Sequence, residues 1–259
     1  MTVMPNATEA ASTSSGEPPA RRDVRAALLV LAAVSLVLLA TFALTLLLVE
    51  DRWAPLLRLD RGARDGLHRY AVTHQGFVAA MRMISSSGSG VAWVVVLAPV
   101  VAWLLWRGLP KPAVFVVVTA VGSSLLNLVV KATVHRLRPV LTDPVALSHG
   151  LSFPSAHAQL AIVGYTVLLL VFLPMLYGSW RRVVIIFAVL AVLTIGFSRI
   201  ALGVHYVSDV VGGFLLGAAW LAAMTAAFSV ISINRERRAQ VTSRRSAAGT
   251  QSLGGKLGG

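Results

Sequence analysis

Cysteine is absent from the 259-residue chain, and ionisable side chains are scarce. Without cysteine there is no disulfide, no thiol nucleophile and no thiolate metal site. Charged residues make up 13% of the sequence, whereas soluble domains carry about 25%. Hydrophobic residues make up 56%. This composition excludes an ordinary water-soluble globule, and it also excludes a disordered chain, which requires low hydrophobicity.

Acidic side chains are the rarest of the charged ones. The chain has 10 Asp and Glu against 23 Lys and Arg, a formal net charge of +13, and its mean hydropathy is +0.77. In a soluble protein such a positive excess favours nucleic-acid binding. In so apolar a chain, basic residues instead flank helices embedded in lipid. We therefore expect a bilayer around this protein and no nucleic-acid partner.

Six long apolar runs occupy the middle of the chain. The first, 26–49, is 24 residues long and reaches about 36 Å as a helix, enough to cross a hydrocarbon core of about 30 Å. It is longer than the apolar part of a cleaved secretory signal, so we expect a retained anchor. The other runs are 91–106, 113–130, 158–177, 183–197 and 209–231. Although the shorter runs alone would suit buried soluble helices, together they predict an all-α integral membrane protein with six transmembrane helices.

Composition also divides the chain into three parts. We expect a disordered cytoplasmic tail at 1–24, a six-span domain at 25–232 and a basic disordered cytoplasmic tail at 233–259. Between the first two spans, residues 52–83 mix apolar side chains with arginines. This pattern favours one or two extracytoplasmic amphipathic helices at the membrane interface, with an ordinary surface connection as the alternative.

The distribution of basic residues predicts an orientation. If the first run begins in the cytoplasm, 13 of the 23 Lys and Arg fall on the cytoplasmic side. The positive-inside rule then places both termini inside. All six histidines fall on the outer side in this arrangement. We therefore expect a multi-pass protein of the cell membrane whose chemistry faces the extracytoplasmic side.

Three polar clusters interrupt the apolar background at the ends of these runs. The link between the third and fourth runs and the link between the fifth and sixth are separated by two crossings, so they open on one side of the membrane. One pocket can therefore hold residues from all three clusters. The residues are Lys131 with Arg138; Ser155 with Ala156 and His157; and Arg199 with His205 and Asp209.

The charges of these clusters match a phosphoryl group. Three cations against the carboxylate of Asp209 leave an excess of about +2, and a phosphoryl group carries roughly −1.5 to −2. Arginine forks and a lysine suit phosphate oxygens. Ser155 and the backbone after it stand where a helix is expected to begin, which is itself an anion site. Taken singly, each cluster also suits an interfacial anchor, a helix end or a structural contact. Their occurrence together on one side favours a site.

Two histidines provide acid–base chemistry in this pocket. His205 and Asp209 are spaced i, i+4, so on a helix they share a face and can form a hydrogen bond. A carboxylate on one imidazole nitrogen leaves the other nitrogen as a nucleophile. His157, from the other link, can then protonate a departing oxygen. In-line displacement at phosphorus needs such groups on opposite sides.

The three clusters resemble the signature of the type-2 phosphatidic acid phosphatase family, the membrane lipid phosphatases related to vanadium haloperoxidases. The matching motifs are Lys131-x6-Arg138-Pro139, Pro154-Ser155-x-His157 and Ser198-Arg199-x5-His205-x3-Asp209. The resemblance implies six spans, an extracytoplasmic pocket and metal-independent hydrolysis through a phospho-histidine.

Site roles follow from this resemblance by position. It implies that His205 is the nucleophile, Asp209 its orienting partner and His157 the general acid. Phosphate binding is implied for Lys131, Arg138, Ser155, Ala156 and Arg199. Ala156 replaces the family's usual glycine, but its backbone N–H remains, and its methyl group is costly only if that position needs a positive φ.

We expect from this resemblance a lipid phosphatase without a cofactor or metal. Its substrate would be an amphiphilic phospholipid or isoprenyl phosphate, with undecaprenyl-type isoprenyl diphosphate as first choice. Phosphatidate, phosphatidylglycerol phosphate and diacylglycerol diphosphate remain open. The alternatives are a lipid or anion transporter, which needs only the positive charge, and a haloperoxidase-like oxidant using vanadate. Gly213-x3-Gly217 in the last run predicts close helix packing.

Overall fold

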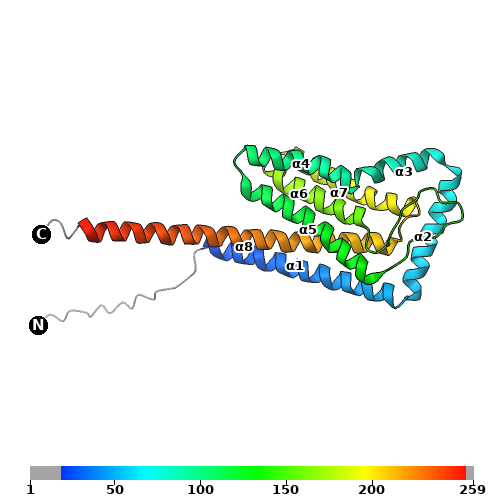
Figure 1. Ribbon diagram of the computed structural model, residues 1–259, viewed down its shortest axis with the longest axis horizontal. Coiled ribbons are helices and arrows are strands. Elements are labelled where there is room, and N and C mark those ends of the chain that lie inside the picture. Colours follow the sequence, from blue (N-terminus) through cyan, green and yellow to red (C-terminus); the bar gives the residue numbers. More distant parts are fainter. Residues whose placement is uncertain (1–18, 255–259) are drawn as a thin grey trace, which may run out of the picture.

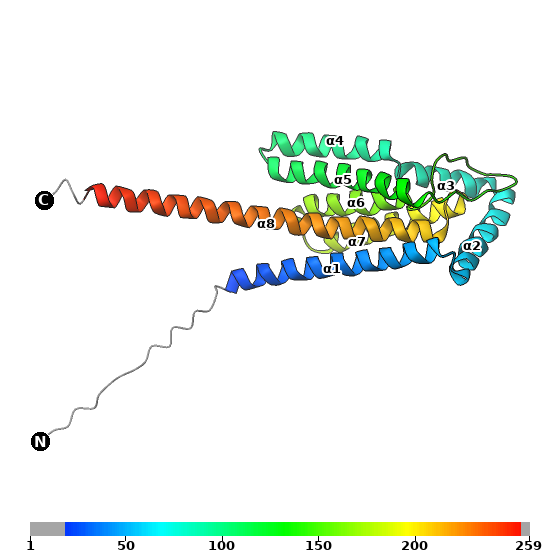
Figure 2. The ribbon, with the colours of Figure 1, turned by 60° about the horizontal axis from the view of Figure 1, so that its bottom comes forward.

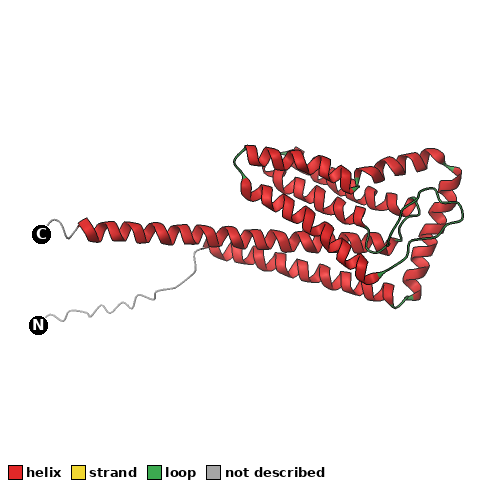
Figure 3. Cartoon of the chain, in the orientation of Figure 1, coloured by secondary structure: helices red, strands yellow, loops and turns green. Residues whose placement is uncertain are grey.

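The computed structural model describes the backbone of residues 19–254 and the side chains of residues 24–231, and this part of the chain is helical throughout with connecting loops (Figure 3). The elements are α1 (Pro19–Glu50), α2 (Ala54–Thr73), α3 (Gln75–Ser87), α4 (Gly90–Trp106), α5 (Pro110–Val134), α6 (Ala156–Phe172), a short 3-10 turn (Leu173–Met175), α7 (Ser179–Ala201) and α8 (Val207–Gly254).

The prediction of an all-helical membrane protein is confirmed, although the number of spans stays open. Five helices in the described part are long and apolar enough to cross a membrane. The count is six if α3 and α4, which meet at an angle of 43°, form one span. The break lies at Gly88, where a Cβ atom would come within 2.5 Å of Ile195. Only glycine therefore lets α7 pack this closely against the junction.

The long helices run side by side, and α8 lies at the centre of their packing. It packs along α1 and along α6, as two views of the bundle show (Figures 1 and 2). A Cβ atom on Gly213 would lie 2.5 Å from the carbonyl oxygen of Ser155, and one on Gly217 would lie 2.6 Å from Ile162. The absence of side chains thus allows α8 to approach α6, and the predicted close packing is confirmed.

A buried amide pair joins α5 to α6 inside the apolar bundle. Asn127 donates from Nδ2 to Oε1 of Gln159 at 2.7 Å, and Gln159 donates in turn to the carbonyl oxygen of Ser123 at 2.8 Å. Polar groups in such surroundings are costly unless they are paired. These bonds therefore fix the register of α6 against α5, and with it the position of the loop that precedes α6.

The segment between the first two long helices is helical, as its composition predicted. Helices α2 and α3 cover most of it, and α2 stands across one end of the bundle (Figure 1). Asp60 and Ala71 of α2 are buried. The position of these helices on the outer membrane surface remains a prediction.

The two ends of the chain differ in how far helix extends. Residues 1–18 and 255–259 lie outside the described residues, so the predicted tails are not tested there. Helix α1 already begins at Pro19, and α8 continues to Gly254. The backbone of 233–254 is therefore helical where a disordered tail was expected. This segment has no proline and contains five arginines and three alanines, which favour helix.

Candidate active site

All three predicted clusters meet at the end of the bundle that α2 crosses. The loop 135–155 joins α5 to α6, and the loop 202–206 joins α7 to α8 at the same end (Figure 1). The N–H of Ser155 donates to the carbonyl oxygen of Asp209 at 2.9 Å. This bond ties the start of α6 directly to the start of α8, so two motifs far apart in sequence form one site.

His205 and Asp209 form the predicted dyad. Nδ1 of His205 lies 3.3 Å from Oδ2 of Asp209, and both side chains are buried. Nη1 of Arg138 lies 3.0 Å from Nε2 of the same imidazole. Arginine has donors and no acceptor, so Nε2 must carry the lone pair and Nδ1 the proton. The geometry therefore selects the tautomer in which Nδ1 carries the proton and Nε2 carries the lone pair.

Burial keeps this imidazole neutral. It lowers the pKa of His205 to about 4, and the opposing influence of Asp209, through its hydrogen bond and charge, does not offset it. The positive charges of Arg138 and Arg199 lower this pKa further. At neutral pH the imidazole of His205 is therefore uncharged and Nε2 carries no proton.

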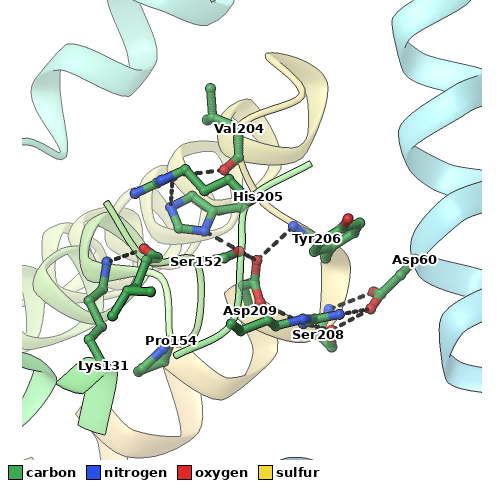
Figure 4. A network of polar contacts seen from close by, with 12 residues as sticks. Asp60, Lys131, Ser152, Pro154, Val204, His205, Tyr206, Ser208 and Asp209 are labelled. Carbon is green, nitrogen blue, oxygen red and sulfur yellow. Dashed lines mark hydrogen bonds and ion pairs between the residues drawn. The ribbon is translucent and has the colours of Figure 1, made fainter. Parts of the chain in front are cut away.

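The carboxylate of Asp209 is held from several directions. Oδ2 accepts from the N–H of Tyr206 at 2.9 Å and from the hydroxyl of Ser152, and Oδ1 accepts from Nη1 of Arg136 at 2.6 Å (Figure 4). Asp209 is the third residue of α8, and its bond to the preceding Tyr206 is half of a capping box. The start of the helix thus orients the carboxylate toward His205.

The predicted cations occupy the same end, each with its own anchor. Lys131 donates from Nζ to the carbonyl oxygen of Leu151 at 2.9 Å. Arg199, which is buried at the end of α7, donates from Nη1 to the hydroxyl of Ser85 at 2.5 Å. Arg138 donates from Nη1 to the carbonyl oxygen of Val204 at 2.8 Å. These bonds leave each cation with further N–H groups for an anion.

Two polar groups in the site are buried without a partner. They are Oγ of Ser155 and Nε of Arg199. Beside Ser155, the first turn of α6 begins at Ala156 and His157, whose backbone N–H groups have no acceptor inside the helix. Ala156 has no positive φ, so alanine in place of the usual glycine causes no strain there. Unpaired buried donors are costly, which makes this corner suited to a bound anion.

His157 lies at the start of α6, partly buried, in the field of the same charged groups. It interacts electrostatically with Arg199, His205, Arg138 and Lys131. Its Cδ2 lies 3.6 Å from the position that a Cβ atom on Gly88 would take. Its ring thus lies beside the junction of α3 with α4, and its role as general acid remains a prediction.

Sequence reasoning missed several contributors to the site, namely Asp60, Ser85, Arg136, Ser152 and Ser208. Arg136 lies two residues before Arg138, within the same loop, and Ser208 directly precedes Asp209, so both had neighbours that marked the region. Asp60 had no such signal, because α2 contacts the site across 148 residues of sequence. Among the described residues, no group of three or more His, Cys, Asp or Glu gathers as metal ligands, and the site's positive charge comes from Lys and Arg.

Comparison with known proteins places these motifs in a family. Residues 112–232 match the family described as the PAP2 superfamily. Phosphatidylglycerophosphatase B of Bacillus subtilis strain 168 is 42% identical over 116 residues, which are 43% of this chain and 53% of that protein. The chain thus spans about half the length of this curated relative.

The fold has a counterpart among solved structures. A transmembrane PAP2-type phosphatidylglycerolphosphate phosphatase from Bacillus subtilis matches with a TM-score of 0.66 at 24% identity, over 74% of this chain and 94% of that one. At this identity the likeness shows a shared fold. The region that matches the PAP2 superfamily, residues 112–232, contains all three motifs, and this match confirms the resemblance that they carry.

Proposed function

We propose that this protein is a membrane lipid phosphatase that works through a phospho-histidine on His205. The observation that carries the proposal is the tautomer of this residue. Asp209 accepts a hydrogen bond from the Nδ1–H group, while Arg138, a phosphate-binding group by its chemistry, faces the lone pair of Nε2 at 3.0 Å. A phosphoryl group that Arg138 binds is therefore delivered to the nucleophilic nitrogen.

The first step transfers the phosphoryl group to the imidazole. Lys131, Arg138 and Arg199 bind its oxygens, together with the hydroxyl of Ser155 and the first N–H groups of α6. The lone pair of Nε2 forms the P–N bond while the P–O bond to the lipid breaks with its electron pair. A general acid, which we assign to His157, supplies the proton that the leaving alkoxide needs.

The second step releases phosphate. Water attacks phosphorus as the same group, now a base, takes one of its protons, and the P–N bond breaks with its electron pair returning to Nε2. Asp209 stabilises the imidazolium form that appears in each step, because its carboxylate is already fixed beside Nδ1. The cycle ends with inorganic phosphate, the dephosphorylated lipid and the original tautomer.

Phosphatidylglycerol phosphate is the first substrate to test. The named activity of the Bacillus subtilis relative supports it over isoprenyl diphosphate, the first choice of the sequence analysis. An amphiphilic substrate is also favoured because the site lies where several apolar helices end. Isoprenyl diphosphate stays in the comparison, since its terminal phosphoryl group presents the same oxygens to the site.

The test is a phosphate-release assay on purified protein in lipid micelles, across phosphatidylglycerol phosphate, phosphatidate, undecaprenyl diphosphate and diacylglycerol diphosphate. We expect release from at least one lipid, and we expect His205→Ala to lower the rate by about 10³-fold or more while lipid binding persists. A transporter would move lipid without release, with or without His205. Halide oxidation after addition of vanadate and peroxide would indicate the oxidant instead.

A further inference from the structure

We propose that Asp60 of α2 is a positioning residue for the dyad of His205 and Asp209, acting through Arg136 and the start of α8. The inference rests on the proposed phosphatase function. It extends the site beyond the family match, because Asp60 lies outside residues 112–232. Asp60 touches neither His205 nor the phosphate-binding cations by any hydrogen bond in the described part, so its influence must be indirect.

The carboxylate of Asp60 is buried, and both of its oxygens accept hydrogen bonds. Its side chain is 1% exposed. Oδ1 accepts from the backbone N–H of Ser208 at 3.0 Å, and Oδ2 accepts from the hydroxyl of the same serine at 2.5 Å. Oδ2 also accepts from Nη2 of Arg136 at 2.8 Å. Figure 4 shows Asp60 reaching from α2 toward Ser208 and Asp209. Such complete pairing is what a buried charge requires.

The bond to Ser208 makes Asp60 a cap supplied by another helix. Ser208 is the second residue of α8, where backbone N–H groups have no acceptor inside their own helix. A carboxylate at this end also stabilises the positive end of the helix dipole. Asp60 therefore anchors the first turn of α8, and the very next residue in that turn is Asp209.

Arg136 carries the second connection. Its Nη1 donates to Oδ1 of Asp209 at 2.6 Å, and its Nη2 donates to Oδ2 of Asp60 at 2.8 Å. The guanidinium carbon lies 4.4 Å above the ring of Tyr206, which fixes the plane of the fork. The planar guanidinium of Arg136 thus bridges the two carboxylates. Its bond to Asp60 fixes how it is oriented toward Asp209.

Loss of the Asp60 charge should loosen this arrangement without removing any group that contacts phosphate. In Asp60→Asn, a neutral amide replaces one acceptor oxygen with a donor, which then opposes either Arg136 or Ser208. Arg136 is left partly unpaired and free to turn, so Asp209 no longer has one orientation toward Nδ1 of His205. The expected loss lies in the chemical step rather than in substrate binding.

The experiment compares Asp60→Asn with a matched control on the same helix. Asp65 pairs with Arg64 at the surface at 2.7 Å and is 47% exposed, so Asp65→Asn removes an equal charge away from the dyad. We expect Asp60→Asn to lower kcat by about tenfold to a hundredfold with little change in KM, as for other groups that orient a reacting ligand. Asp65→Asn should leave both constants near those of the unchanged protein.

A second variant and a spectroscopic readout separate positioning from a general loss of structure. Arg136→Lys keeps the positive charge but cannot bridge two carboxylates, so it should also lower kcat. Imidazole ¹⁵N spectra, with His205 assigned from its missing signal in His205→Ala, should show a single Nδ1–H tautomer in the unchanged protein. In Asp60→Asn the Nδ1–H proton should move upfield, because its hydrogen bond to Asp209 is weakened while Arg138 still holds Nε2.

The outcomes are distinct. If Asp60→Asn matches Asp65→Asn in kcat and keeps the Nδ1–H shift of the unchanged protein, the positioning role is wrong while the phosphatase proposal stands. If the unchanged protein releases phosphate from none of the lipids, the proposed function fails. The Nδ1–H shift of His205 in Asp60→Asn then decides the positioning role alone, and an unaltered shift overturns it.

Discussion

At the scale of single residues, the site is organised by groups that compensate one another. His205 is buried and would be a poor base if it were charged, so Asp209 orients it rather than keeping it protonated. Ser155 differs, because its hydroxyl is buried and no group in the described part compensates it with a hydrogen bond. The burial of the His205 imidazole and of the unpaired Ser155 hydroxyl costs stability, and proteins accept such local costs at functional sites.

The titration of His205 is a direct prediction of this burial. Its pKa of about 4 lies below the 6.5 of a free histidine, so the imidazole stays neutral down to about pH 4. Protonation below that pH consumes the lone pair of Nε2 and breaks its bond from Arg138, so the nucleophile is lost as the pH falls. The ¹⁵N chemical shift of His205 followed against pH measures the midpoint. A midpoint near 6.5 would contradict the burial argument.

Ser155 allows function to be separated from stability. Because its hydroxyl has no partner in the protein, Ser155→Ala breaks no internal hydrogen bond and should leave the melting temperature unchanged or slightly raised. The same change removes a donor to the phosphoryl group, so we expect the rate of phosphate release to fall about tenfold to a hundredfold. Thermal melting and the release assay on one preparation give both values. A drop in melting temperature with full activity would show that this hydroxyl is structural.

At the scale of elements, the start of α8 determines the position of the dyad. Its first turn carries Ser208 and Asp209, is capped by Asp60 of α2 and bonds to Ser155 before α6. Farther along, the missing side chain of Gly213 lets α8 pack closely against the carbonyl oxygen of Ser155 at the start of α6. The site is therefore assembled by the contact of α8 with α6 and α2.

Gly213→Ala tests this contact. The added Cβ would lie 2.5 Å from the carbonyl oxygen of Ser155 and 3.1 Å from Cβ of Ala158, so one helix must move. We expect a loss of about 1–3 kcal/mol in unfolding free energy, typical of overpacking. Activity should also fall, because Ser155 is bonded to Asp209.

Gly62→Ala in α2 is the matched control, since a Cβ there meets nothing within 4 Å. The methyl group should stabilise the helix by about 0.5–1 kcal/mol through helix propensity. Chemical denaturation in micelles measures both variants. Equal stability of Gly213→Ala and the unchanged protein would show that the helices have room to separate.

At the scale of the whole molecule, chemistry is concentrated at one end of a bundle whose sides are apolar. The loops that bear the motifs lie at the end crossed by α2, and the turn between α6 and α7 lies at the other end (Figure 1). The count of basic residues predicts that the site end faces out of the cell. The orientation stays a prediction that a labelling experiment can decide.

Because the chain has no cysteine, a single introduced cysteine is the only thiol that a labelling reagent can modify. Leu147, in the loop before α6, is 79% exposed, and Tyr177, before α7, is 82% exposed. We expect Leu147→Cys in intact cells to react with a membrane-impermeant maleimide, and Tyr177→Cys to react only after the membrane is opened. The reverse pattern would place the site in the cytoplasm, whereas labelling of both would show that the two positions share a side.

The sequence by itself determined the helical membrane class and most of the candidate site residues. Apolar runs long enough to cross a bilayer require helix, because lipid offers no partner to the backbone. The sequence placed His205 and Asp209 on one helix, but His205 lies in the loop before α8, and the turn at the start of that helix brings its imidazole to Asp209. The two crossings between links brought Lys131 and Arg199 to one end.

Only the tertiary structure decided what holds that dyad in place. Asp60 and Ser208 are 148 residues apart, and their bond depends on how α2 crosses the bundle, a packing outcome with no local signature. The tautomer of His205 likewise required the observed approach of Arg138 to Nε2. Contacts between distant segments arise from the shape of the packed helices, whereas local spacing and hydropathy specify only what each helix can present.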